Sequence, residues 1–238
     1  MKAVIVIPAR WASTRFPGKP LAMIAGISLI QRVYERAKRA KRASAVFVAT
    51  DDQRIADHVA SFGGKVVQPK GEFQSGTDRI AASLPLLGGE FDAVVNVQGD
   101  EPLVEPDAID GIVDALGTAD MATLACPLES GELRSRDIVK VVTALDGTAL
   151  YFSREPLAGA ERHVGLYGYQ TRVLRALAKL EPSPLERAES LEQLRALQNG
   201  FKIRVLHTAK PHLGVDRPED VVRVEKELAH MADREANS

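Results

Sequence analysis

The sequence has one cysteine and almost no net charge. Its 238 residues include Cys126 alone, so no disulfide can form within the chain. Cys126 lies in an apolar run, where we expect a buried and inert thiol, and one unpaired cysteine is typical of a reducing cytoplasm. The formal charge is −1, which leaves no bulk basic field to hold nucleic acid or an anionic membrane. We therefore expect a cytoplasmic protein with neither of these partners.

Long apolar runs and the common phosphate-binding fingerprints are also missing. No stretch approaches the roughly 18 consecutive apolar residues of a membrane span. The apolar run 3–7 is too short for the hydrophobic region of a signal peptide. Neither G-x-x-x-x-G-K-[ST] nor G-x-G-x-x-G follows it. With no internal repeat and no low-complexity linker, the chain is expected to form one domain over residues 1–238.

The first half alternates short apolar runs with segments of helical periodicity. We expect strands at 4–7, 45–49, 65–67, 93–97 and 121–125, and helices at 28–41, 53–62, 79–87 and 105–116. Continuous apolar strands separated by helices predict an α/β fold, a doubly wound and mostly parallel sheet covered on both faces.

The second half has a different pattern. Residues 139–144 and 149–152 flank an Asp-Gly turn, which predicts a hairpin. Further strands are expected at 163–169 and 202–206, and helices near 171–179, 191–198 and 218–230 with a frayed tail beyond. We expect this half to add antiparallel strands to the sheet and to act as a lid or a dimer surface.

A basic loop follows the first predicted strand. Arg10, Arg15 and Lys19 lie within ten residues, and Gly18 permits close approach of the backbone to a ligand. Ligands of open α/β sheets bind where the parallel strands end. Arginine forks and a mobile lysine suit the oxygens of a triphosphate, so the loop is predicted to bind an anion. A solvated basic loop is the alternative interpretation.

Five ordered motifs make the sequence similar to a known family. They are the loop 8–21, Ser75-Gly76-Thr77-Asp78-Arg79, the segment 96–102, Tyr151-Phe152-Ser153-Arg154 and Gly214-Val215-Asp216. Together they resemble the 3-deoxy-manno-octulosonate cytidylyltransferases, or CMP-Kdo synthetases. The resemblance implies a nucleotidyltransferase-type sheet and transfer of CMP from CTP to the anomeric hydroxyl of Kdo, for lipopolysaccharide synthesis. It also implies Mg²⁺ and a homodimer.

The resemblance also assigns residues to the nucleotide and the metal. Arg10, Lys19, Asp100 and Asp216 would be catalytic, and the two aspartates would hold Mg²⁺. The nucleotide would be bound by Pro8, Ala9, Arg10, Arg15, Lys19, Ser75, Gly76, Thr77, Arg79 and Gln98. From the residues alone, Asp100 also fits a turn beside a glycine, and Asp216 a cap before Pro218. Residues 1–127 would form mainly the nucleotide-binding half, and 128–238 the sugar-binding and dimerisation half.

On the sugar side, the resemblance points to Arg154, His163, Tyr167, Glu192 and Gln193. Two departures from the family concern this side. Phe73-Gln74 replaces an acidic residue and a histidine, and only eight residues separate Arg154 from His163. Transfer to another sugar acid, a modified Kdo or a sialic-acid-like one, is therefore an alternative. A non-catalytic nucleotide-binding module is a further one.

Overall fold

The computed structural model describes residues 1–12, 15–73 and 75–236. Ser13 and Thr14 of the basic loop, and Gln74, lie outside the described residues. Within the described chain, nine strands form one sheet and two more form a small hairpin. The strands are β1 (Ala3–Pro8), β2 (Met23–Ile24), β3 (Ile27–Ser28), β4 (Ala43–Ala49), β5 (Val66–Val67), β6 (Ala93–Asn96), β7 (Met121–Cys126), β8 (Lys140–Thr143), β9 (Ala149–Ser153), β10 (Glu161–Gln170) and β11 (Ile203–His207).

Eight α-helices connect or flank these strands in the described residues. They are α1 (Leu29–Ala37), α2 (Gln53–Ser61), α3 (Gly76–Ser83), α4 (Pro106–Ala115), α5 (Thr171–Leu177), α6 (Pro184–Glu189), α7 (Gln193–Gln198) and α8 (Pro218–Ala236). Short 3₁₀ turns occupy Lys19–Leu21, Leu84–Leu86 and Glu132–Arg134. No described helix is both long and apolar enough to cross a membrane.

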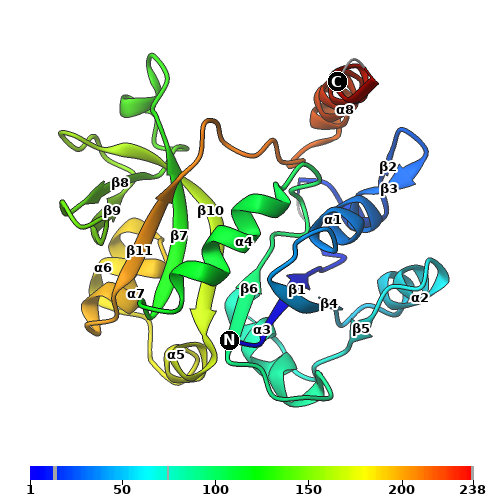
Figure 1. Ribbon diagram of the computed structural model, residues 1–238, viewed down its shortest axis with the longest axis horizontal. Coiled ribbons are helices and arrows are strands. Elements are labelled where there is room, and N and C mark those ends of the chain that lie inside the picture. Colours follow the sequence, from blue (N-terminus) through cyan, green and yellow to red (C-terminus); the bar gives the residue numbers. More distant parts are fainter. Residues whose placement is uncertain (13–14, 74, 237–238) are drawn as a thin grey trace.

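The sheet has the order β11-β7-β10-β6-β1-β4-β5, and Figure 1 shows it running through both halves of the chain. β1 pairs in parallel with β4 and β6, and β11 pairs in parallel with β7. β10 is antiparallel to both of its central neighbours, β6 and β7. The prediction of a mostly parallel sheet with antiparallel strands from the second half is confirmed. One of those strands lies in the middle of the sheet rather than beside it.

Both faces of the sheet are covered by helices. Alternate side chains of β1 point to opposite faces, as the pleat requires, so Ile5 and Val6 join different hydrophobic clusters. α1, α2, α4 and α8 pack on the Ile5 side, while α3, α5 and α7 pack on the other. Gly168 of β10 permits the close fit of α4, because a Cβ there would lie 2.3 Å from Ile112 Cγ2. Because β1, β4 and β6 are parallel, their carboxyl ends lie at one edge of the sheet.

One local expectation was wrong, and one helix was missed. The predicted frayed tail after His230 is helical, and α8 continues to Ala236. Leu228 and Met231 pack against the core, so the last turns of α8 have a hydrophobic reason to form. α6 was not predicted, although Ser183 and Glu186 form a capping box at its start.

Candidate active site

The basic loop leaves β1 and is held closed by an aromatic contact. Gly18 adopts φ +70°, and a Cβ on it would lie 2.9 Å from the Trp11 ring. The Arg54 guanidinium from α2 lies over the Trp11 ring, 3.4 Å from its centroid. Glycine is therefore required here both for the backbone conformation and for the indole. The contact fixes the loop just before Lys19.

Lys19 draws together two carboxylates that are more than a hundred residues apart in the chain. Its Nζ lies 2.7 Å from Asp100 Oδ2 and 3.6 Å from Asp216 Oδ1. Arg15 adds a second cation 3.4 Å from Asp216. The Val215 amide donates to the Asp100 carbonyl oxygen at 2.8 Å, which joins the two segments through the backbone. The sequence could not show this pairing from spacing.

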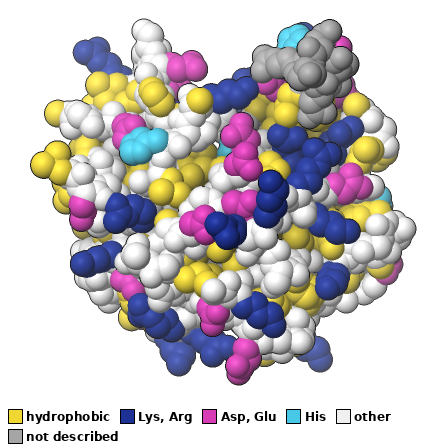
Figure 2. Space-filling view, viewed as in Figure 1, with side chains coloured by type: hydrophobic (Ala, Val, Ile, Leu, Met, Phe, Trp, Pro, Cys, Tyr) yellow, Lys and Arg dark blue, Asp and Glu magenta, His cyan; other side chains and the backbone are white. Residues whose placement is uncertain are grey.

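A cavity of about 280 Å³ opens over these charges. It is lined by Pro8, Ala9, Arg10, Arg15, Lys19, Pro20, Phe73, Ser75, Gly76, Arg79, Gln98, Gly99, Asp100 and Asp216. All the residues predicted to bind the nucleotide are among them except Thr77. On the face shown in Figure 2, Lys and Arg side chains alternate with Asp and Glu across the surface. Positive charge for an anion is thus supplied locally, by this loop and Arg79.

Two features shape the floor of this cavity. A Cβ on Gly99 would lie 2.7 Å from the Pro8 carbonyl oxygen, so only glycine lets the ends of β1 and β6 meet this closely. Ser75 caps α3, since its hydroxyl accepts from the Asp78 amide at 3.1 Å. The start of α3 therefore faces the same space as the basic loop.

Arg79 is a nearly buried cation in the wall of the cavity. Its Nη2 donates to Asp51 Oδ2 at 2.9 Å, and its guanidinium lies 5.0 Å from the centre of the Phe73 ring. Its buried Nη1 has no hydrogen-bond partner among the described residues. A buried donor without a partner is costly, so this nitrogen indicates a site for an acceptor such as a phosphate oxygen.

The chemistry of the two aspartates fits Mg²⁺. This ion takes one or two protein carboxylates and completes its octahedron with water and substrate phosphates. Asp100 and Asp216 supply two carboxylates in the lining of the cavity that the basic loop also borders. The described residues hold no cluster of three or more His, Cys, Asp or Glu side chains able to form a full protein cage. The assignment of Mg²⁺ stays a prediction.

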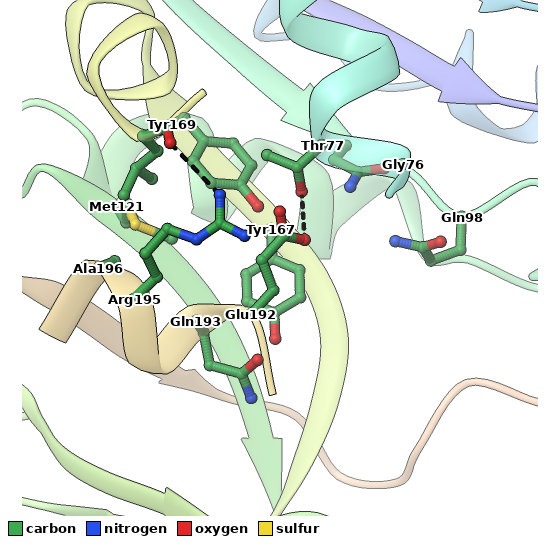
Figure 3. A pocket seen from close by; sticks show the side chains of 12 residues that line it. Gly76, Thr77, Gln98, Met121, Tyr167, Tyr169, Glu192, Gln193, Arg195 and Ala196 are labelled. Carbon is green, nitrogen blue, oxygen red and sulfur yellow. Dashed lines mark hydrogen bonds between the residues drawn. The ribbon is translucent and has the colours of Figure 1, made fainter. Parts of the chain in front are cut away.

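A second cavity, of about 220 Å³, adjoins the first and shares Gly76 and Gln98 with it (Figure 3). It is lined further by Thr77, Asn96, Met121, Tyr167, Tyr169, Leu177, Glu192, Gln193, Arg195 and Ala196. Three residues predicted to bind the sugar, Tyr167, Glu192 and Gln193, are therefore brought together here. Thr77, predicted to bind the nucleotide, lies on this side of the shared wall.

The second cavity is rich in hydrogen-bond acceptors. Glu192 accepts from Ser75 Oγ at 3.1 Å and from Thr77 Oγ1 at 2.8 Å. Burial raises the pKa of the Glu192 carboxyl, and it also raises that of the Tyr167 hydroxyl well above its usual value. Asn96 Oδ1 is buried and has no hydrogen-bond partner among the described residues. Such a lining suits a ligand that carries several hydroxyl donors.

Arg154 and His163 line neither cavity. Arg154 donates to two backbone carbonyls, from Nε to Glu189 at 3.2 Å and from Nη1 to Arg136 at 3.0 Å. His163 Nε2 lies 2.9 Å from Thr123 Oγ1, and burial lowers the pKa of its ring to about 3. Both side chains form hydrogen bonds within the protein. Their assignment to the sugar stays a prediction.

Sequence reasoning did not single out several residues of the site. Asn96 and Tyr169 line the second cavity from strands, where they read as ordinary strand residues. Arg195 forms two hydrogen bonds to Glu186, at 2.6 and 2.8 Å, and is nearly buried. His212 pairs with Glu101 at 3.0 Å beside the aspartates. The one available signal was that Asn96 is the first residue of the motif 96–102, which also contains Gln98 and Asp100.

The described fold and site define a nucleotidyltransferase: a parallel sheet edge holds a basic loop, two facing carboxylates and two adjoining cavities. Residues 4–203 match the cytidylyltransferase family model. A 3-deoxy-manno-octulosonate cytidylyltransferase of Syntrophotalea carbinolica is 48% identical over 249 residues, covering 96% of this chain and 99% of the relative. That of Myxococcus xanthus is 49% identical over 235 residues, covering 94% and 95%.

A solved structure gives the same result. CMP:2-keto-3-deoxy-manno-octonic acid synthetase, solved in complex with CTP, is 39% identical and superposes with a TM-score of 0.93. The match covers 97% of this chain and all of the other. The chain belongs to the cytidylyltransferase family, among the 3-deoxy-manno-octulosonate cytidylyltransferases.

Proposed function

We propose that the protein couples CTP to the anomeric hydroxyl of Kdo, giving CMP-Kdo and pyrophosphate for lipopolysaccharide synthesis. Relatives of this name and a CTP-bound structure of 39% identity support the reaction. The observation that carries it in this chain is the meeting of Lys19, Asp100 and Asp216 at a cavity of about 280 Å³. These three residues come from the beginning, middle and end of the sequence.

We further propose how the residues divide the work. The nucleotide occupies the first cavity, with its phosphates on Arg10, Arg15 and Lys19 and with Arg79 Nη1 as a further donor. Positioning and charge neutralisation then carry most of the catalysis, as in other phosphoryl transfers. When bound on Asp100 and Asp216, Mg²⁺ supplies positive charge against the phosphate oxygens.

The sugar acid occupies the second cavity. Its hydroxyls donate to Glu192 and Asn96, while Tyr167 and Gln193 border the space. The anomeric hydroxyl attacks the α-phosphorus where the two cavities adjoin at Gly76 and Gln98, and it loses its proton to water. The bond from the α-phosphorus to the β-phosphate oxygen breaks, and Arg10 and Lys19 stabilise the leaving pyrophosphate. Residues 1–127 thus serve mainly the nucleotide and residues 128–238 mainly the sugar, within one domain of residues 1–238, although Asp216 lines the first cavity and Asn96 the second.

The acceptor is tested by pyrophosphate release from a panel of nucleoside triphosphates and sugar acids. We expect release with CTP and Kdo, and at least ten-fold slower release with UTP or with a nine-carbon sialic acid. Faster release with a modified Kdo or a sialic-type acid would reassign the acceptor. No release with CTP and any acid would favour a nucleotide-binding module. Chelation of Mg²⁺ should abolish release, and added Mg²⁺ should restore it.

The proposal includes a cytoplasmic homodimer formed by the second half. The turn between β8 and β9 leaves Leu145 fully exposed, and Leu150 of β9 is 62% exposed. We take these two exposed leucines of one hairpin as the proposed dimer contact. Sedimentation should give a dimer for the wild type and a monomer for Leu150→Lys. A wild-type monomer at micromolar concentration would contradict the dimer without affecting the activity.

A further inference from the structure

The wall between the two cavities is a hydrogen-bonded unit. Ser75 lines the first cavity, Thr77 the second, and Gly76 both. Glu192, at the start of α7, accepts from both hydroxyls and so joins the nucleotide segment to the sugar side. In Figure 3 its carboxylate points at Thr77, with Tyr167 and Gln193 beside it. A single carboxylate therefore contacts a lining residue of each cavity.

The hydroxyl protons of this unit are fully used. Each hydroxyl has one proton to donate. Ser75 donates its proton to Glu192 while accepting from the Asp78 amide, and Thr77 donates its proton to the same carboxylate. An acceptor atom of a nucleotide can gain either proton only if Glu192 gives it up. The reverse holds for a sugar hydroxyl that donates to Glu192, since it sets Ser75 or Thr77 free.

No ion pair of Glu192 among the described residues would compensate the loss of the hydrogen bonds from Ser75 and Thr77. Glu192 forms no salt bridge within the described residues, and the neighbouring Arg195 pairs with Glu186 instead. Its carboxylate is partly buried, and the nearby Asn96 Oδ1 is already an acceptor without a donor. Taking hydroxyl donors away from a buried carboxylate is unfavourable unless new donors replace them. A polyhydroxylated ligand in the second cavity brings such donors.

We propose that Glu192 couples the two cavities, so that a nucleotide and a sugar acid each tighten the binding of the other. The inference depends on the proposed function for the identity of the two ligands. Each ligand supplies the hydrogen bonds that the other displaces from the Ser75–Glu192–Thr77 unit. Coupling between two sites is reciprocal, and it commonly changes affinity by about five- to 150-fold.

The test measures binding in the absence of reaction. Calorimetry gives the Kd of CTP with Mg²⁺, alone and with a saturating Kdo analogue that lacks the anomeric hydroxyl, so that no transfer occurs. We expect the analogue to lower the Kd of CTP by about ten-fold. Reciprocity requires that CTP lower the Kd of the analogue by the same factor.

Two variants locate the coupling. In Glu192→Ala the factor by which the analogue lowers the Kd of CTP should fall to about one. CTP alone should bind as tightly as in the wild type or tighter, because the hydrogen bonds from Ser75 and Thr77 to Glu192 no longer have to be broken. In Thr77→Val the factor should also fall, because one of the two hydroxyls that donate to Glu192 is removed. Thr171→Val is the matched control: it removes a hydroxyl that donates to the Phe91 carbonyl, away from both cavities, and should keep the wild-type factor.

Wild-type independence of the two ligands would overturn the inference, as would a wild-type factor in Glu192→Ala. Weaker binding of CTP alone by Glu192→Ala would indicate a merely structural role. If Glu192→Ala does not fold, Glu192→Gln takes its place, and its factor should again be smaller than the wild type's. Turnover of CTP and Kdo without coupling rejects the inference alone. Absence of both turnover and analogue binding rejects the proposed function as well.

Discussion

The lining of the first cavity was predicted from the sequence more completely than the lining of the second. The first is lined by the segments that follow β1 and β6, by the start of α3 and by Asp216, and its predicted lining converges in the structure except for Thr77. The second is lined by residues of β6, β7 and β10 and of α3, α5 and α7, and only part of its predicted lining converges. Arg154 and His163 are instead engaged by Glu189, Arg136 and Thr123. The position of a residue that follows a parallel strand can be predicted from the sequence, because such strands end at one edge of the sheet. The position of a residue in a hairpin or between two helices cannot be predicted in this way.

The largest effect is expected at the first cavity. Asp100→Ala and Lys19→Ala should each lower the turnover number by about 10²–10³-fold, the usual loss when a charge-stabilising group is removed. Thermal unfolding should change little, because both side chains are partly exposed at the cavity. Asp57→Ala, on the exposed face of α2, is the control. Turnover near the wild-type value in either variant would remove that residue from the mechanism.

A smaller effect should follow from Gly99→Ala. The new Cβ would lie 2.7 Å from the Pro8 carbonyl oxygen, so β1 and β6 must separate and carry Asp100 away from Lys19. We expect turnover to fall on the order of ten-fold and the free energy of unfolding by about 1–3 kcal/mol. Gly165→Ala is the matched control, since a Cβ there meets no atom within 4 Å. Equal behaviour of the two variants would show that the strand ends need no close approach.

Much of this fold follows from sequence pattern, and the exceptions have physical reasons. The strand ending before Gln98 and Asp100 could be predicted because apolar β-branched runs mark buried parallel strands. Asp216 was placed only through family resemblance, since no spacing rule connects it to Asp100. The central position of β10 was missed because periodicity identifies a strand without giving its neighbours.

Local signals were also overlooked. Ser183 and Glu186 form a capping box, with Pro184 as the first residue of α6. This pattern of residues is a known signal for the start of a helix. Lys140 reads as a surface residue of a hairpin, yet it is fully buried and donates to the Ser135 and Arg154 carbonyls at 2.5 and 2.7 Å. No local pattern shows that a lysine will find two carbonyls in the interior.

Arg154 allows the two halves to be compared directly. Its guanidinium contacts backbone carbonyls, so Arg154→Ala should lower the free energy of unfolding by about 1–3 kcal/mol. The Kd of CTP should not change. The KM of the acceptor should rise less than in Gln193→Ala, because Gln193 lines the second cavity and Arg154 does not. An acceptor KM that rises as much as in Gln193→Ala, with stability unchanged, would place Arg154 on the sugar.

The last test concerns the pH dependence of stability. Burial lowers the pKa of His163 to about 3, whereas an unfolded histidine titrates near 6.5. Between these values the unfolded state binds the extra proton, so this side chain destabilises the fold as the pH decreases from about 6.5 towards 3. The slope is at most about 1.4 kcal/mol per pH unit. Denaturant unfolding of His163→Gln should show a flatter pH profile over this window than the wild type or His230→Gln, whose histidine is exposed. A slope unchanged in His163→Gln would mean that the ring takes up a proton in the folded state, and that it is open to solvent or ligand as the sugar assignment requires.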